Sequence, residues 1–142
     1  MHNIRQILEQ KGSEILAVAP DDLVIDAVRR MAEHSVGAML VLRDGEMLGM
    51  FSERDYARKV ILAGRASRET RVEEVMSSPV VTIDPRATAE EGLALMTRKR
   101  IRHLPVIEKG ALIGLVSIGD LVNAVIGDQR LLIQQLEMYV RG

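Results

Sequence analysis

The sequence predicts a mixed α/β (α+β) fold in which one β-α-β-β-α unit occurs twice. The two copies are expected to pack as one pseudo-two-fold domain, with extra helices at both ends. Three observations predict this: an ungapped self-match at a shift of 65 residues, helical apolar spacing followed by strand-sized apolar runs, and a Ser-x-x-Asp motif in each copy. At 142 residues, the chain has the length of one ordinary domain.

The self-match relates residues 20–61 to residues 85–126 without a gap. Nine positions are identical, and they fall at predicted turns, caps and core positions, where structure dictates the residue. They are Pro20/Pro85, Met31/Met96, Val41/Val106, Gly45/Gly110, Gly49/Gly114, Ser52/Ser117, Asp55/Asp120, Val60/Val125 and Ile61/Ile126.

Each element of the unit has a pattern of its own. A short leading strand is predicted at residues 15–18 and 80–83. A helix is predicted next, because apolar residues follow the spacing i, i+3, i+4, i+7 from Val24 and again from Ala89. Two continuous apolar runs then flank a turn with Gly45 or Gly110, which predicts a hairpin of buried strands. A second helix follows, over 52–63 and 117–126.

These elements give the predicted domain organisation, a single domain over residues 1–142. Repeat 1 covers about 12–64, a linker with a short helix covers 65–79, repeat 2 covers about 80–127, and a C-terminal helix covers 128–142. The linker helix rests on the capping-box pattern Thr70-Arg71-Val72-Glu73. Another helix is expected near 4–10. An apolar stripe on the C-terminal helix, formed by Leu132, Leu136 and Tyr139, predicts either docking on its own domain or a dimer contact.

Composition excludes several classes of function. Hydrophobic residues make up 47% of the chain, enough for a core, and the net charge of −1 does not fit a general nucleic-acid or membrane-surface binder. The absence of cysteine excludes disulfides and thiol catalysis and favours a reducing, cytoplasmic location. The apolar runs are too short to span a membrane, and the N-terminal residues lack the apolar stretch of a signal peptide.

The two Ser-x-x-Asp motifs, Ser52 to Asp55 and Ser117 to Asp120, have two interpretations. A serine followed by an acid three residues later is an ordinary helix cap. The same position, a helix N-terminus directly after a buried strand, is also where sheet proteins bind ligands. A carboxylate repels phosphate but accepts hydrogen bonds from a diol. The motifs therefore favour a nucleoside or ribonucleotide over free phosphate.

A basic run from Arg98 to Arg102, ending in His103, precedes the second hairpin. Arg98 to Arg100 fit a solvated helix C-terminus. Arg102 and His103 lead into a buried strand, where a guanidinium and an imidazole could hold phosphates. The first copy has Gly37 and Ala38 there, and its nearest compensating charge is Arg54. The two predicted sites are chemically unequal.

The sequence does not predict an enzyme. There is no cysteine nucleophile, no Gly-rich phosphate loop and no nucleophile elbow. The three histidines lie far apart, without the spacing of metal ligands. No catalytic residue and no metal site are therefore predicted.

The segments Arg100 to Val106 and Gly114 to Asp120 resemble the CBS (cystathionine-β-synthase-type) domain family, and Gly49 to Asp55 looks like the same motif. The resemblance covers nearly the whole chain as a stand-alone tandem pair, a Bateman module. It implies a regulatory sensor that binds an adenosine-containing ligand in the cleft between the repeats. AMP is the first choice, with ADP, ATP, NAD(H) or S-adenosylmethionine as further family ligands and no catalytic cofactor.

The resemblance also implies roles for individual residues. The motif aspartates Asp55 and Asp120 hold the ribose, Ser52 and Ser117 approach the phosphates, and Arg102 and His103 contact phosphate. Backbone and apolar contacts to adenine come from Ile101, Leu104 and Pro105, and from Ala38 and Met39 in the first copy, with Thr82 and Val18 as weaker assignments.

Partners follow from the same resemblance. A homodimer is expected, together with a regulated protein that the sequence does not name, and neither nucleic acid nor membrane. A ligand-independent dimeric interaction scaffold is the alternative, in which the Ser-x-x-Asp motifs are only caps. A nucleic-acid or cyclic-nucleotide binder, motivated by Arg98 to Arg102, is more distant.

Overall fold

The computed structural model describes residues 1–141, which form two units of mixed α/β structure. The central unit comprises residues 15–80. The terminal unit joins residues 1–14 to the chain from Val81 onward. The predicted fold class is therefore confirmed, and each unit contains one of the two repeats.

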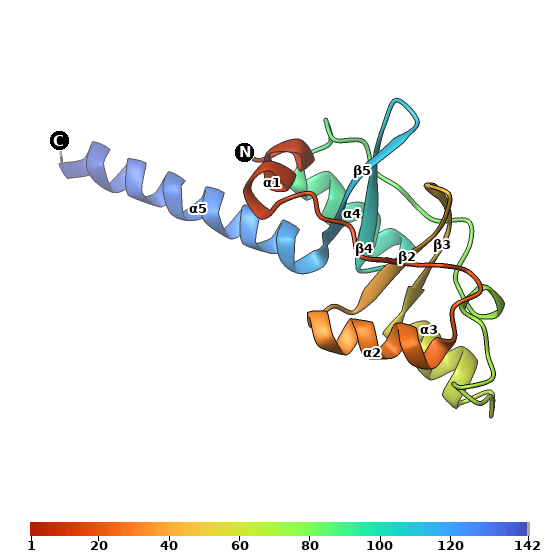
Figure 1. Cartoon of the computed structure of the whole chain (residues 1–142). Helices are drawn as coiled ribbons and strands as arrows, with labels where there is room; N and C mark the ends of the chain where they lie inside the picture. Colours follow the sequence, from red (N-terminus) through yellow and green to blue (C-terminus); the bar gives the residue numbers. More distant parts are fainter. Residues whose placement is uncertain (142) are drawn as a thin grey trace. The chain divides into compact units, whose positions relative to one another are not determined.

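The central unit is built on a three-stranded sheet of order β1-β2-β3 (Figure 1). β1 pairs parallel with β2, and β2 pairs antiparallel with β3. Its elements are β1 (Ala17–Val18), α2 (Val24–His34), β2 (Ala38–Arg43), β3 (Glu46–Ser52), α3 (Glu53–Asp55), the π-helix η1 (Tyr56–Ile61) and the 3₁₀ turn η2 (Val72–Glu74). Its core includes Val24, Met39 and Phe51, all fully buried.

The terminal unit repeats the hairpin and its two helices. Its elements are α1 (Ile4–Lys11), α4 (Ala89–Lys99), β4 (His103–Glu108), β5 (Ala111–Ser117) and α5 (Ile118–Arg141). β4 and β5 pair antiparallel, with the same bulge position as β2 and β3. Ile4, Leu104 and Leu121 are fully buried in its core. α5 runs on beyond the rest of its unit (Figure 1).

Both predicted hairpin turns are confirmed. Asp44 and Gly45 have φ of 51° and 81°, and Lys109 and Gly110 have φ of 50° and 80°. Two successive residues with positive φ match the twist of the flanking strands, and glycine adopts this conformation without a steric cost.

Each repeat packs against a short segment that lies outside the self-match. We call these two segments, α1 and residues 70–76, the covering segments. α1 lies on the repeat that follows residue 80, and the segment 70–76 lies on the repeat that precedes it. Ile4 N–H donates to Ala87 O at 2.9 Å, and Val72 N–H donates to Asp22 O at 2.9 Å. Asp22 and Ala87 are related by the shift of 65, whereas Ile4 and Val72 are related by 68.

A second pair of hydrogen bonds repeats in the same way, with donor residues 68 apart and acceptor residues 65 apart. Arg5 N–H donates to Pro85 O, and Glu73 N–H donates to Pro20 O. The predicted linker is thus a structural part of the central unit. An ungapped comparison could not detect this, because the stretch from Ile4 to Pro20 is three residues longer than the stretch from Val72 to Pro85.

Two leading strands are shorter than predicted. β1 has two residues instead of 15–18, and 80–83 contributes only a parallel bridge from Ile83 to Val106. Pro20 and Pro85 follow these segments closely. Because proline lacks an N–H, Pro20 and Pro85 end the parallel ladders, whereas the missing strand residues lie at the N-terminal ends of the predicted segments.

The linker cap was assigned to the wrong residue. Thr70 Oγ1 donates to Ala66 O at 2.8 Å instead of accepting at a helix start. The Glu74 carboxylate accepts from Arg71 N–H at 2.7 Å, and the helix shrinks to one 3₁₀ turn at η2. The cap therefore joins Arg71 and Glu74, one residue later in the chain than the predicted pair of Thr70 and Glu73.

The second helix of repeat 1 does not run as one α-helix over 52–63. It begins as α3 and continues as η1, where bonds span five residues, as from Leu62 N–H to Ala57 O at 3.0 Å. Asp55 and Val60 are both buried, although they are five residues apart. The wider π-helical turn places these two residues on the same side of the helix.

The two predicted C-terminal helices, 117–126 and 128–142, are one continuous helix, α5. A glycine inside a helix costs only about 1 kcal/mol, so Gly127 does not end it. The Asp128 carboxylate accepts from His2 N–H at 2.9 Å and contacts His2 Nδ1 at 2.6 Å. These bonds hold the helix in place beside α1.

We expect Gly49→Ala to destabilise the protein by about 1–3 kcal/mol, as overpacking does. A Cβ at Gly49 would lie 2.7 Å from Met76 Sδ and 2.9 Å from the backbone O of Ser77. At Gly114 it would meet only the Leu8 side chain, at 2.7 Å. Because that side chain can rotate, Gly114→Ala should cost less. Urea unfolding followed by circular dichroism measures both.

Gly127→Ala is the matched control, because nothing lies within 4 Å of the added Cβ. It should stabilise α5 by up to about 1 kcal/mol. A Gly49→Ala variant as stable as Gly127→Ala would contradict the close packing of the covering segment.

Candidate ligand-binding site

The Ser-x-x-Asp corner of the terminal unit lies where β5 becomes α5. Ser117 Oγ accepts from Asp120 N–H at 3.2 Å, and Asp120 Oδ2 accepts from Ser117 N–H at 2.8 Å. The predicted reciprocal cap is therefore present. It holds the Asp120 carboxylate over the end of the strand instead of letting it turn to solvent.

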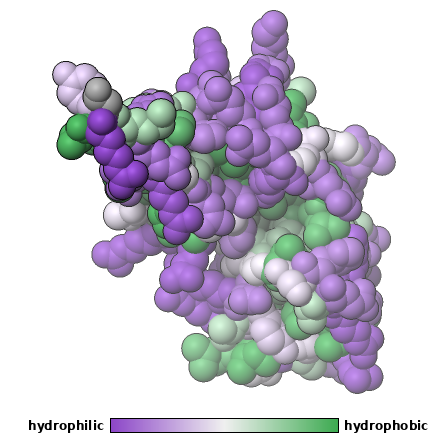
Figure 2. Space-filling model, turned by 90° about the vertical axis from the view of Figure 1, so that its left-hand side faces the viewer, coloured by the Kyte–Doolittle hydropathy of each residue, from purple (hydrophilic) through white to green (hydrophobic). Residues whose placement is uncertain are grey.

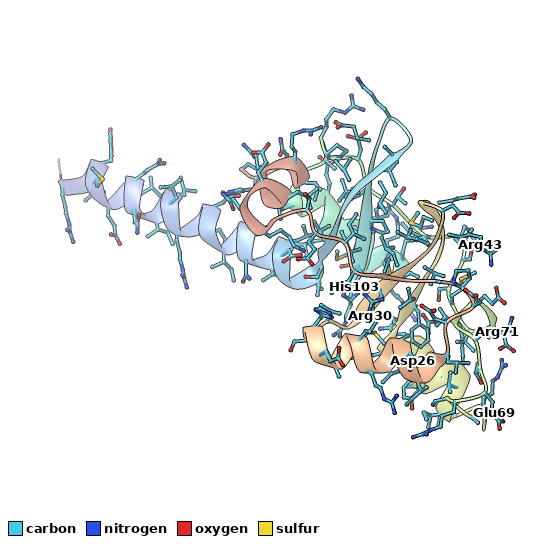
Figure 3. All side chains as sticks on the ribbon, viewed as in Figure 1. Asp26, Arg30, Arg43, Glu69, Arg71 and His103 are labelled. Carbon is cyan, nitrogen blue, oxygen red and sulfur yellow. The ribbon has the colours of Figure 1, made fainter. Side chains whose placement is uncertain are left out.

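The structure brings Arg102 and His103 to this corner. His103 opens β4 and lies opposite Ser117 in the register, at the end of the hairpin (Figure 3). Ile118 N–H, at the start of α5, donates to Arg102 O at 2.9 Å. The side chain of Arg102 is exposed, and that of His103 is partly exposed. Four of the predicted ligand residues thus converge on one strand-to-helix corner.

Lys11, at the end of α1, is a member of this corner that the sequence did not predict. Its Nζ donates to Asp120 Oδ2 at 2.6 Å and to Leu115 O at 2.9 Å. Lys11 and Asp120 are 109 residues apart in the chain. Only the packing of α1 on the second repeat joins them, and no motif marks that packing.

Lys11 also changes the acidity of Asp120. Partial burial by itself raises the pKa of Asp120. The hydrogen bonds from Lys11 and the Ser117 backbone, with the attraction of the Lys11 charge, outweigh burial, and the pKa of Asp120 lies below its ordinary value. The carboxylate is therefore ionised at neutral pH and acts as an acceptor.

The equivalent corner of the central unit is more closed. Asp55 Oδ2 accepts from Ser52 N–H and from Ser52 Oγ, both at 3.0 Å. Asp55 Oδ1 accepts from Ser77 Oγ at 2.8 Å and pairs with Lys59 Nζ at 3.1 Å. Both oxygens are therefore engaged within the unit. Lys59 could have been found from the sequence, because it lies one helical turn after Asp55.

The two corners differ most in exposure. The side chain of Asp120 is 23% exposed and that of Asp55 is 9% exposed. Glu53 N–H donates to Gly37 O at 3.0 Å, the counterpart of the bond from Ile118 to Arg102. The backbone is thus shared, while the side chains differ. Arg54 occupies an exposed position at the first turn of its helix.

Most of the predicted adenine contacts belong to the cores. Val18, Met39 and Leu104 are at most 3% exposed and pack inside the hydrophobic clusters of their units. Ala38 and Pro105 are buried, and Thr82 and Ile101 are partly buried. For the three core residues, contact with a ligand would have to come from the backbone.

Other kinds of site are missing from the part of the chain that the structure describes. Residues 1–141 contain no group of three or more His, Asp or Glu side chains that could hold a metal ion. Within the same range, no helix has the length and apolarity needed to cross a membrane.

Comparison with known proteins gives a consistent result. A family model described as the CBS domain matches residues 4–61 and again residues 72–127. The two matches begin at Ile4 and Val72, the pair related by the shift of 68 in the fold.

Solved structures are similar over most of the chain. A candidate signal-transduction protein with CBS domains from Burkholderia ambifaria MC40-6 is 48% identical, with a TM-score of 0.86, covering 89% of this chain and 96% of that one. A CBS-domain containing protein from Agrobacterium tumefaciens is 36% identical, with a TM-score of 0.82, covering 86% and 98%.

A curated relative spans the chain as well. The mitochondrial CBS domain-containing protein CBSX3 of Arabidopsis thaliana is 40% identical over 148 residues, covering 98% of this chain and 72% of the relative. These three proteins are named for CBS domains or signal transduction, not for an enzymatic activity. Because this relative is named as mitochondrial, the cytoplasmic location stays a prediction.

We expect Lys11→Met to raise the pKa of Asp120 toward the ordinary value of about 3.9. A folded-state pKa below the unfolded one stabilises the protein above pH ~4, and this stabilisation is lost as the pH falls through the folded pKa. Lys11→Met should therefore lower stability at pH 7 and flatten its loss in acid. Carboxyl chemical shifts measured by NMR between pH 2 and 6 report the pKa directly.

Lys109→Met is the control for removing an exposed lysine from the same unit. It should leave the titration of Asp120 unchanged, since Lys109 lies in the turn between β4 and β5, at the other end of the hairpin from Ser117. The same titration curve in wild type and Lys11→Met would show that the ion pair does not form.

Proposed function

We propose that this chain, which belongs to the CBS-domain family, is a regulatory sensor that binds an adenosine-containing ligand. CBS domains are commonly regulatory modules for such ligands. The observation that carries the proposal here is the corner of the terminal unit, where a serine, an ionised carboxylate, an arginine and a histidine converge at a strand end and a helix start.

The ribose is assigned to Asp120. An ionised carboxylate only accepts hydrogen bonds, and the 2′- and 3′-hydroxyls of ribose donate them. Ser117 N–H and Lys11 Nζ both bond to Oδ2. We therefore assign Oδ1 to the ligand hydroxyls. The same bonds fix the orientation of the carboxylate before a ligand arrives, which lowers the entropic cost of binding.

The phosphates are assigned to Arg102, His103 and the start of α5. The exposed guanidinium can form paired hydrogen bonds to phosphate oxygens, and the helix N-terminus favours a negative charge. Ser117 Oγ lies at the same helix start. One or more phosphates fit this set better than an uncharged nucleoside, so AMP is our first choice, with ADP, ATP or NAD(H) after it.

The central unit is the weaker candidate. Both oxygens of Asp55 are engaged and its side chain is nearly buried. Gly37 and Ala38 replace the arginine and histidine of the terminal unit. A ligand there would have to displace Ser77 or Lys59. We propose that the site in the terminal unit fills first.

Regulation follows from differential binding. A ligand shifts an equilibrium between two states by as much as its affinity for them differs. Because Lys11 joins α1 to the ribose-binding carboxylate, a ligand at Asp120 acts directly on the attachment of α1. We propose that a regulated protein reads this change.

We expect AMP at about a hundredfold its Kd to stabilise the chain by about 2.7 kcal/mol, a rise of several degrees in Tm. Asp120→Asn should abolish this shift, because an amide places a donor where the ribose also donates. Asparagine still accepts from Ser117 N–H, so the cap survives. Thermal unfolding with AMP, ADP, ATP, NAD⁺ and S-adenosylmethionine at millimolar concentration measures the effect.

Asp84→Asn is the matched control, since Asp84 is an exposed aspartate of the same unit that pairs with Arg86. It should bind AMP as the wild type does. 2′,3′-Dideoxyadenosine monophosphate, which lacks the diol, should bind at least tenfold more weakly than AMP. The proposal fails if no adenosine compound shifts the Tm, or if the dideoxy compound binds as well as AMP.

A further inference from the structure

The last three turns of α5 form an apolar surface that no other described part of the terminal unit covers. All residues from Leu131 to Arg141 are exposed, and the large apolar side chains among them are between 54% and 85% exposed. They are Leu131, Leu132, Ile133, Leu136, Met138, Tyr139 and Val140. Figure 2, which is viewed from the side to which α5 extends, shows hydrophobic atoms at the surface.

The pattern on this surface is that of a helix seam. Ile126, Ile133 and Val140 recur every seven residues, and Val122 and Leu136 occupy the other core position of the same heptad, with Gln129 between them. Ile133, Leu136 and Val140 lie together on one face of the helix, next to Glu137 and Arg141. A helix with an exposed apolar seam, here interrupted only by Gln129 among these core positions, is stabilised in water when another helix covers it.

We propose that α5 pairs in antiparallel orientation with α5 of a second copy of this chain. The charges flanking the seam select this partner. Arg130 and Glu137 occupy equivalent heptad positions on one side of it. In an antiparallel pair these positions face each other, so Arg130 meets the partner's Glu137 and Glu137 meets the partner's Arg130. A single contact, repeated by the two-fold axis, satisfies four charges.

The other side of the seam agrees with the same register. Leu132 and Tyr139 flank it there, and antiparallel pairing places Leu132 against the partner's Tyr139. In the core of the pair, Ile133 packs against the partner's Leu136. The two-fold axis repeats this contact, so Leu136 packs against the partner's Ile133. Parallel pairing would instead place Leu132 against the charged Glu137 of the partner subunit. Charge and apolar matching thus favour the antiparallel pair.

Length fits this arrangement too. The register pairs residues from about 129 to 141, a helix of ~20 Å, and these residues follow Asp128, which bonds to His2 just before α1. A free helix this short is marginal in water. Here the folded terminal unit provides its first turns (Figure 1). The inference does not depend on the ligand site.

Charge reversal tests the pairing without disturbing a buried residue. Arg130→Glu places Glu against the partner's Glu137, and Glu137→Arg places Arg against the partner's Arg130. Each single variant should raise the dissociation constant of the pair at least about tenfold. The double variant R130E/E137R should restore it. Sedimentation equilibrium at ~50 mM salt, where exposed charges are little screened, measures all four proteins.

Mixing gives the sharper result. In a mixture of R130E and E137R chains, each acidic α5 faces a basic one, so a heterodimer should form and dominate the native mass spectrum. Gln134→Glu, on the opposite face of α5, is the control and should pair as the wild type does. If the chains also associate through a second interface, the single variants should lose only the α5 pair. The mass of the assembly should then fall to half that of the wild type.

Four results would overturn the proposal. The wild type stays a single chain at ~100 µM, the single variants keep the wild-type dissociation constant, the double variant is not rescued, or the mixture forms no heterodimer. A single-chain wild type that co-sediments with phosphatidylcholine vesicles would assign the surface to lipid instead. Circular dichroism confirms that the variants keep their helix content.

Discussion

The hydrogen bonds between Ser117 and Asp120 are the interaction on which the rest of this protein depends. They end β5, begin α5 and fix a carboxylate at the corner between them. The same exchange between Ser52 and Asp55 forms the corner of the other unit. Capping and ligand binding are therefore compatible roles here, because one carboxylate oxygen can serve the cap while the other faces a ligand.

The covering segments make the two corners different. α1 brings a lysine to Asp120, whereas the segment after η2 brings the Ser77 hydroxyl to Asp55. Both aspartates meet an ammonium, Lys11 for Asp120 and Lys59 for Asp55, but the hydroxyl of Ser77 and the deeper burial of Asp55 close its corner more completely. A duplicated backbone thus carries two chemically distinct corners. Part of the difference lies inside the ungapped repeat, in Arg102 and His103 against Gly37 and Ala38, and part lies outside it, in Lys11 against Ser77.

Much of the fold could be predicted from the sequence, since it depends on local patterns. The hairpins followed from Gly45 and Gly110, and the first helix of each repeat from apolar spacing. The positions of Ser52 and Ser117 as caps followed from the motif. What could not be predicted depends on distant contacts. Nothing near Lys11 indicates Asp120, and nothing near Gly127 indicates that His2 holds the next residue of α5.

The candidate site was predicted in the same partial way. Arg102, His103, Ser117 and Asp120 converge because register and cap bring them together. Met39 and Leu104, which the resemblance assigns to backbone and apolar contacts with adenine, have side chains in the cores, and their role at a ligand stays a prediction. A motif indicates where backbone geometry must be met, but it does not say which neighbouring side chain points into the core.

A crystal structure of the chain with AMP tests the central claim most directly. We predict the ribose hydroxyls within hydrogen-bonding distance of the Asp120 carboxylate and the phosphate beside Arg102 and the start of α5. AMP bound elsewhere, with Asp120 bonded only to Ser117 and Lys11, would contradict the account.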